Sequence, residues 1–152
     1  MTNPYHPYPV TIRDIRTETE DKSLKTFTFV FDSPEDESAF DFTCGQFAML
    51  SVQGVGEIPI GIASSPTEKP EVKFTVFNTG KVTSHLHRMK AGDAMGIRGP
   101  LGNGFPMDRL AGKNILIIGG GFAFTTLRSF IESARQPENR HRFKNIDVVY
   151  GA

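Results

Sequence analysis

The hydrophobic pattern of the chain changes once, after Pro106, and this change constrains the fold more than any other feature. Before it, short stretches alternate between faces, as in residues 25–31 (KTFTFVF), where Phe recurs at every second position from Phe27. This period of two is typical of strands with one buried face. After it, residues 114–119 (NILIIG) form a continuous apolar run, which predicts a strand covered on both faces. The pattern therefore predicts two parts, residues 1–108 and residues 109–152.

The first part contains short segments with strand character, separated by turns. Their predicted ranges are residues 10–19, 24–31, 46–52, 58–64, 71–77 and 94–98. One short helix is predicted around residues 83–89, and the acidic segment 33–42 (SPEDESAFDF) is predicted to be a loop. This succession favours a closed or nearly closed six-stranded antiparallel β-barrel, because an open sheet of this size leaves exposed edges.

The second part follows the order strand, helix, strand. After the strand at residues 114–119, a helix is predicted over residues 120–136, and a polar connection leads to a buried strand at residues 146–152. The predicted packing stripe of the helix is Phe124, Leu127, Ile131 and Ala134. The pattern predicts one βαβ unit, an incomplete α/β Rossmann-like fold. Because two strands are too few for a stable sheet, we expect a truncated nucleotide domain or strands that pack on another chain.

Composition excludes several classes of partner. The chain has 17 Lys and Arg against 17 Asp and Glu, a balance that argues against nucleic acid and anionic membranes. It has neither the apolar run of a signal peptide nor the roughly 20 apolar residues of a membrane span. The only cysteine, Cys44, cannot by itself form a disulfide or hold an iron–sulfur cluster. We therefore expect a cytoplasmic protein with no nucleic-acid partner, no membrane span and no iron–sulfur cluster.

Residues 80–106 (GKVTSHLHRMKAGDAMGIRGPLGNGFP) begin with a pattern suited to binding a phosphate. Gly80 opens the segment, Thr83 and Ser84 follow, and a short helical pattern comes next. The first turn of a helix has unpaired N–H groups and a partial positive charge, and two hydroxyls add further donors. The alternative is a plain turn in which Thr83 caps the helix.

Two other glycine-containing segments are candidates for close approach of a ligand. Residues 58–64 (IPIGIAS) place Gly61 and Ala63 between apolar residues, which leaves room for a flat ligand or marks a barrel corner. The triple glycine at residues 119–121 stands between strand and helix, as in turns that hold a pyrophosphate, although Phe124 occupies the place of the third small residue. The alternative is a glycine-rich turn without a ligand.

In combination, GQFAMLSV, GKVTS, RGPLGNGFP and the NILIIGGG–LRS spacing resemble the ferredoxin–NADP reductase-like superfamily. The chain is most similar to its electron-transfer subunits of the sulfhydrogenase gamma, anaerobic sulfite reductase and dihydroorotate dehydrogenase types. The resemblance implies a Greek-key, FAD-binding barrel followed by an NAD(P)-binding domain. It implies that the cofactor-binding residues are Pro59, Ile60, Gly61, Ile62, Ala63 and Ser64 along the flavin, Phe77 and Asn78 at its border, Gly80, Lys81, Val82, Thr83 and Ser84 at its pyrophosphate, and Gly119, Gly120 and Gly121 at the nucleotide turn.

The chain departs from the pattern of this superfamily at positions near the flavin. Gly61 and Ala63 stand where many relatives carry hydroxyls, and Ile58 stands where they carry an arginine. Thr125 and Thr126 replace an alanine–proline pair in the nucleotide turn. These departures predict that some polar contacts to the flavin are missing.

The resemblance implies a function in electron transfer. The flavin would accept a hydride from NAD(P)H and pass electrons to a partner, with no catalytic side chain in this chain. The partners would be catalytic or iron–sulfur subunits of a redox complex, or the remainder of the nucleotide domain, and a homo-oligomer stays open. Because later strands of that domain are absent from the sequence, NAD(P)H oxidation is not expected of this chain alone. The alternatives are a non-catalytic interaction module that has lost the cofactor and a reductase of free flavin.

Overall fold

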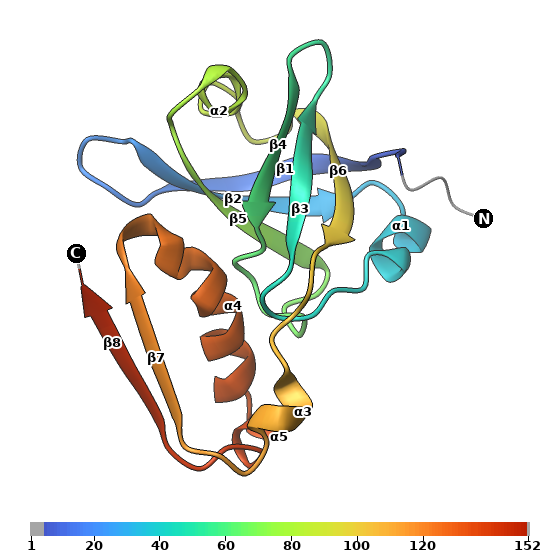
Figure 1. Cartoon of the computed structure of the whole chain (residues 1–152). Helices are drawn as coiled ribbons and strands as arrows, with labels where there is room; N and C mark the ends of the chain where they lie inside the picture. Colours follow the sequence, from blue (N-terminus) through green and yellow to red (C-terminus); the bar gives the residue numbers. More distant parts are fainter. Residues whose placement is uncertain (1–4, 152) are drawn as a thin grey trace.

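The computed structural model describes residues 5–151, and its first part is a six-stranded antiparallel sheet (Figure 1). The strands are β1 (Tyr8–Thr17), β2 (Leu24–Phe31), β3 (Phe47–Val52), β4 (Gly56–Gly61), β5 (Glu71–Phe77) and β6 (Ala94–Leu101). Each strand lies within a few residues of its predicted range. The alternation of apolar and polar residues therefore located every strand of this sheet.

The sheet is curled but not closed. Its order is β4-β3-β6-β1-β2-β5, and the connection from β5 to β6, which contains α2 (Lys81–Leu86), crosses from an edge strand to the middle of the sheet. Just beyond β4, Ile62 forms a single bridge with Phe74 of β5. The predicted six-stranded antiparallel barrel is confirmed in its nearly closed form: β4 ends at Gly61, so its edge meets β5 at one point and not along its length.

The core of the sheet consists mainly of the apolar residues that alternate along its strands. Phe27, Phe29 and Phe74 are fully buried, and the rings of Phe29 and Phe74 meet edge to face at 5.9 Å. Leu86 of α2 is also fully buried, so this short helix is fixed to the sheet. The sheet therefore gives α2 a firm support.

The segment predicted to be a loop contains a helix, α1 (Pro34–Ala39), so that prediction was wrong. The Ser33 hydroxyl accepts a hydrogen bond from the Asp36 N–H at 3.1 Å, which caps the helix. Pro34 stands in the first turn, where it displaces no hydrogen bond, together with acidic residues that favour the positive end of a helix. A serine followed by a proline and acidic residues is the sequence signal for a helix start that the prediction missed.

The second part is the predicted βαβ unit. It contains α3 (Met107–Leu110), β7 (Ile115–Gly120), the 3₁₀ turn η1 (Gly121–Ala123), α4 (Phe124–Arg135), α5 (Pro137–Arg140) and β8 (Ile146–Gly151). Strands β7 and β8 pair in parallel, and Ala152 of the predicted strand lies outside the described residues. The short helices α3 and α5 were not predicted. No helix within residues 5–151 combines the length and apolarity needed to cross a membrane.

Helix α4 covers only one face of the β7–β8 sheet (Figure 1). On that face, Ile117 packs in a cluster with Phe130 and Ala134 of α4, which confirms the predicted packing stripe. On the other face, Leu116 is 61% exposed and Ile118 is 69% exposed. The prediction of a strand covered on both faces is therefore met on one face only, because within the described residues no element packs against the second.

The two parts share a buried contact. Cys44, from the connection between α1 and β3, belongs to the hydrophobic cluster of the βαβ unit, and its thiol donates a hydrogen bond to the Ser129 carbonyl at 3.4 Å. Phe105 packs against the same cluster, and its ring meets Phe130 at 6.2 Å. These contacts hold α4 against the sheet. Residues from before position 108 thus contribute to the hydrophobic cluster of the βαβ unit. The division of the chain into domains at residue 108 stays a prediction.

Candidate functional site between the sheet and the glycine turn

The turn that opens α2 is held together by the Thr83 hydroxyl. This oxygen accepts hydrogen bonds from the N–H groups of Thr79 at 3.0 Å and Gly80 at 2.7 Å, and donates to the Gly80 carbonyl at 3.0 Å. The Ser84 hydroxyl donates to Asn78 Oδ1 at 2.8 Å. Both hydroxyl protons are therefore used within the turn, which agrees with the alternative of a turn capped by Thr83. That these residues contact a phosphate stays a prediction. The backbone N–H groups of the first helical residues are left for an anion.

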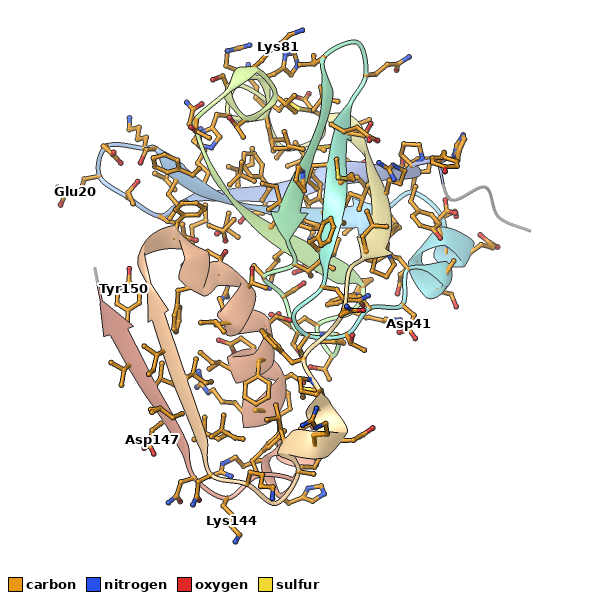
Figure 2. All side chains as sticks on the ribbon, viewed as in Figure 1. Glu20, Asp41, Lys81, Lys144, Asp147 and Tyr150 are labelled. Atoms are coloured by element: carbon orange, nitrogen blue, oxygen red, sulfur yellow. The ribbon has the colours of Figure 1, made fainter. Side chains whose placement is uncertain are left out.

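The same turn leaves open space beside its backbone. A β-carbon built on Gly80 would meet only Thr83 Oγ1, at 4.0 Å. Lys81 is exposed at the outer end of the molecule (Figure 2), and Val82 packs toward Gly56 at the start of β4. The turn thus combines a fixed shape, free N–H groups and access, and these features fit a diphosphate.

The strand predicted to lie along the flavin divides into an accessible and an inaccessible half. Pro59 is exposed, and Ile60 and Gly61 are half-buried. Beyond them, Ile62, Ala63 and Ser64 are fully buried. The Ser64 hydroxyl accepts from the Lys73 N–H at 3.0 Å, so this half of the segment joins β5 and the core. Only the stretch from Pro59 to Gly61 offers surface to a ligand.

Gly61 is covered by a side chain from the other part of the molecule. A β-carbon built on Gly61 would overlap Thr126 Oγ1 and lie 3.2 Å from Thr126 Cβ. Thr126 belongs to the first turn of α4, so the start of this helix lies against the end of β4. The glycine is required for this close approach.

The triple glycine serves two different structural purposes. At Gly119, a β-carbon would lie 2.5 Å from Phe124 Cδ2 and 2.8 Å from Leu127 Cδ1, so glycine lets α4 pack on β7. Phe124 fits in this turn because its ring occupies the space beside Gly119. Gly121 has a φ of +55° and open surroundings, and it turns the chain from β7 into η1. Packing against α4 excludes a side chain at Gly119, and the positive φ disfavours one at Gly121.

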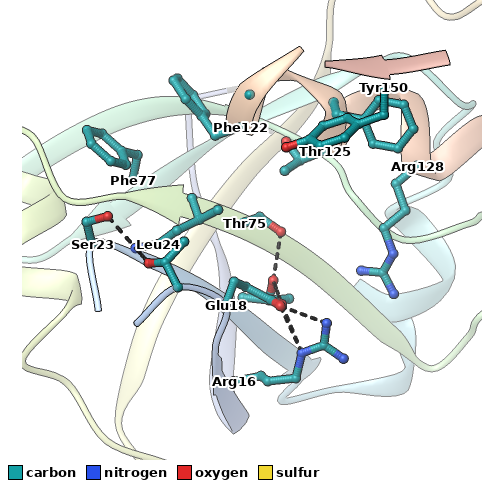
Figure 3. A pocket seen from close by; sticks show the side chains of 14 residues that line it. Arg16, Glu18, Ser23, Leu24, Thr75, Phe77, Phe122, Thr125, Arg128 and Tyr150 are labelled. Carbon is teal, nitrogen blue, oxygen red and sulfur yellow. Dashed lines mark hydrogen bonds and ion pairs between the residues drawn. The ribbon is translucent and has the colours of Figure 1, made fainter. Parts of the chain in front are cut away.

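A cleft of about 590 Å³ lies between the β1–β2 hairpin, the end of β5 and the glycine turn (Figure 3). The residues that matter most in its lining are Phe77, Gly121, Phe122, Thr125, Arg128 and Tyr150. The cleft lies at the carboxyl ends of β7 and β8 and at the start of α4, where α/β sheets bind their ligands. It brings Phe77 and Gly121, both predicted site residues, into one wall.

Aromatic side chains form much of this cleft. Phe77 of β5 and Phe122 of the glycine turn stack with ring centroids 5.5 Å apart and an interplanar angle of 14°. Tyr150, at the end of β8, meets Phe124 edge to face at 5.2 Å. Neither Phe122 nor Tyr150 was predicted from the sequence as a site residue. Phe122 directly follows the triple glycine, and Tyr150 lies near the carboxyl end of β8, so their positions were the available signal.

A charged group forms the floor of the cleft. Glu18 accepts hydrogen bonds from Arg16 Nη2 at 2.7 Å and from the Thr26 hydroxyl at 2.6 Å. Burial alone would raise the pKa of Glu18, but these hydrogen bonds and the charges of Arg16 and Arg128 outweigh it and lower the pKa. Glu18 therefore stays ionised, and the cleft has both a carboxylate and guanidinium groups. Glu18 and Thr26 were not predicted as site residues, because the pairing of β1 with β2 brings them together, and Arg128 reaches the same cleft from α4.

A curled antiparallel sheet with an open helix turn, joined to a glycine-turn βαβ unit, is an architecture suited to binding a dinucleotide. The chain belongs to the family described as the oxidoreductase FAD-binding domain, whose model matches residues 15–105, more than half of the chain. This confirms the resemblance to the ferredoxin–NADP reductase-like superfamily. The match ends before the glycine turn, so the family assignment rests on the sheet and the α2 turn.

Relatives of known name agree with this assignment. The chain is 40% identical over 149 residues to sulfhydrogenase 2 subunit gamma of Pyrococcus furiosus, covering 98% of this chain and 50% of that protein. It is 32% identical over 133 residues to a probable dihydroorotate dehydrogenase B (NAD(+)) electron transfer subunit of Thermococcus kodakarensis, covering 84% of this chain and 51% of that protein. The chain thus spans about half the length of these relatives.

A solved structure shares the fold. The ferredoxin NADP+ reductase of Neisseria gonorrhoeae, solved with bound FAD and NADP, superposes with a TM-score of 0.73 at 22% identity. The superposition covers 95% of this chain and 56% of the reductase. At this identity the likeness concerns the fold, including both the sheet and the βαβ unit.

His87, at the end of α2, gives the sheet a pH dependence that can be measured. Burial lowers the pKa of His87, the hydrogen bond of its ring to the Val76 carbonyl at 2.9 Å opposes this, and the Lys25 charge lowers it further. Because the folded pKa lies below the unfolded one, stability is complete above about pH 6.5 and falls as the pH drops toward the folded pKa.

We expect the unfolding free energy of the wild type to decrease between pH 7.5 and pH 5 more than that of a His87→Gln variant. Glutamine retains an N–H donor for Val76 and does not titrate. Urea unfolding followed by circular dichroism at several pH values measures both slopes. Equal slopes would show that His87 does not contribute.

Proposed function

We propose that this chain is the FAD-binding part of an electron-transfer subunit of an oxidoreductase complex. The observation that carries the proposal is the open turn at Gly80, which presents free N–H groups in a fixed shape within a family of FAD-binding domains. Bound FAD supplies the redox chemistry, accepting electrons in pairs and releasing them singly. The residues of this chain bind it, orient it and shield it from water.

Each accessible segment has a distinct role in this proposal. The backbone of residues 81–83 holds the diphosphate, because helix N-termini bind anions. Asn78 and Ser84 keep the turn in shape through their hydrogen bond. Pro59, Ile60 and Gly61 border the flavin ring on one strand, and Phe77 borders it at the end of β5.

The aromatic cleft beside the glycine turn is proposed for the nicotinamide nucleotide. Gly119, Gly120 and Gly121 form the turn, and Arg16 and Arg128 supply positive charge nearby. The Neisseria reductase was solved with NADP as well as FAD, which supports the placement of a nucleotide next to this fold. The chain spans about half the length of these relatives, and NAD(P)H oxidation by this chain alone is not proposed.

The proposed partners are catalytic or iron–sulfur subunits of a redox complex. Both relatives are named as subunits, one of a sulfhydrogenase and one of a dihydroorotate dehydrogenase. The exposed apolar residues Leu116, Ile118 and Val149 on β7 and β8 offer a surface that such a subunit, or the rest of a nucleotide domain, would cover.

FAD binding tests the proposal directly. Purified chain, freed of flavin and titrated with FAD, should show a protein-bound flavin spectrum and a dissociation constant of about 1 μM or lower, equivalent to about −8 kcal/mol. Riboflavin, which lacks the diphosphate, is the matched ligand and should bind at least about tenfold more weakly. The absence of saturable FAD binding by folded chain would contradict the proposal and favour a non-catalytic interaction module.

A further inference from the structure

The end of β4 and the first turn of α4 meet at Gly61 and Thr126. Gly61 has no side chain, and Thr126 brings a hydroxyl next to it from α4. In the structure, the Thr126 hydroxyl occupies the volume that a side chain on Gly61 would fill. A hydroxyl is therefore present at the end of β4 although the strand itself does not provide one.

The Thr126 hydroxyl is free to serve a ligand. Thr126 is half-buried, and none of the hydrogen bonds among residues 5–151 uses its Oγ1. Because the residue is partly exposed, this hydroxyl is accessible from outside the protein and can donate a hydrogen bond to a ligand. The neighbouring stretch from Pro59 to Gly61 is the accessible part of the predicted flavin strand.

We propose that Thr126 is a flavin-positioning residue, which supplies from α4 the hydroxyl that Gly61 lacks. This inference rests on the proposed function, since it assigns a contact to the same FAD site. The contact differs from those proposed above because the βαβ unit provides it and the sheet does not. Full affinity for FAD therefore requires that α4 packs against β4.

The first test exchanges the two residues and needs no cofactor. A Gly61→Ser side chain would collide with Thr126, and we expect the unfolding temperature to fall by about 3 °C or more. Adding Thr126→Ala removes the obstacle, and the double variant should recover most of this loss. If the double variant is no more stable than Gly61→Ser alone, the two side chains do not share this space and the inference fails.

The second test measures the contact to the flavin. Thr126→Val, which keeps the shape and removes the hydroxyl, should weaken FAD binding about fivefold and shift the visible flavin spectrum. Thr126→Ser should bind like the wild type, and the Gly61→Ser/Thr126→Ala double variant should regain affinity because the hydroxyl returns to the strand. A wild type that binds FAD while Thr126→Val shows the same affinity and spectrum overturns the inference but leaves the proposed function standing. A wild type that does not bind FAD overturns both.

Discussion

Replacing Thr83 with valine should weaken FAD binding at least tenfold and lower the unfolding free energy by about 1–3 kcal/mol. The reason is that the hydroxyl of this buried residue satisfies the N–H groups of Thr79 and Gly80. Valine has nearly the same shape and no acceptor, so these groups lose their partner and the turn relaxes. Isothermal titration with FAD and chemical unfolding measure the two effects.

Thr83→Ser is the matched control, because it keeps the hydroxyl and removes only a methyl group. It should retain FAD affinity within about threefold, a difference of roughly 0.6 kcal/mol. Circular dichroism at the temperature of the titration establishes that both variants are folded. Wild-type FAD affinity in folded Thr83→Val would mean that the shape of the α2 turn does not determine binding.

Gly119→Val should destabilise the chain by about 2–3 kcal/mol through collision with α4. A β-carbon at this position lies 2.5 Å from Phe124 Cδ2 and 2.8 Å from Leu127 Cδ1, so both side chains must leave the positions in which they pack α4 on β7. The preference of valine for strands is worth at most about 1 kcal/mol and is too small to offset this. Guanidinium unfolding followed by circular dichroism measures the loss.

Gly120→Ala provides the comparison one residue away. Its β-carbon would lie 3.4 Å from the Gly151 carbonyl, which is an ordinary contact, and its φ of −136° is accessible to alanine. We expect a change within about 0.5 kcal/mol. If Gly119→Val and Gly120→Ala lost equal unfolding free energy, the glycine turn itself, and not the packing of α4 on β7, would be the cause.

Local patterns in the sequence predicted most of the fold. The alternation in β2 and β5 reports burial, which repeats along the chain with the geometry of each element. The continuous apolar run of β7 predicted the strand, although only one of its faces is covered. The prediction of a loop at residues 33–42 was wrong, because the helix there has only six residues and its main signal is the cap at Ser33. The closure of the sheet could not be predicted, because it depends on how the ends of β4 and β5 meet.

The candidate site could be predicted only in part. The glycine turn and the α2 turn are visible as motifs, and the structure places Phe77 and Gly121 in the lining of one cleft. Phe122, Tyr150 and Glu18 were not predicted as site residues, because the cleft that they line is formed by segments far apart in the sequence. The sequence left two roles open for Thr83, since a hydroxyl that caps its own turn looks the same in sequence as one that faces a phosphate.

The sequence by itself determined the strands, the βαβ unit and the two turns, because each arises from residues close together in the chain. Only the tertiary structure decided that Thr126 fills the space at Gly61, that Phe122 stacks on Phe77, and that one face of β7 is exposed. These features depend on the docking of α4 against the sheet, and docking is set by side-chain volumes from distant segments. Periodicity reports which face of an element is buried, whereas the identity of the partner on that face follows from packing in three dimensions.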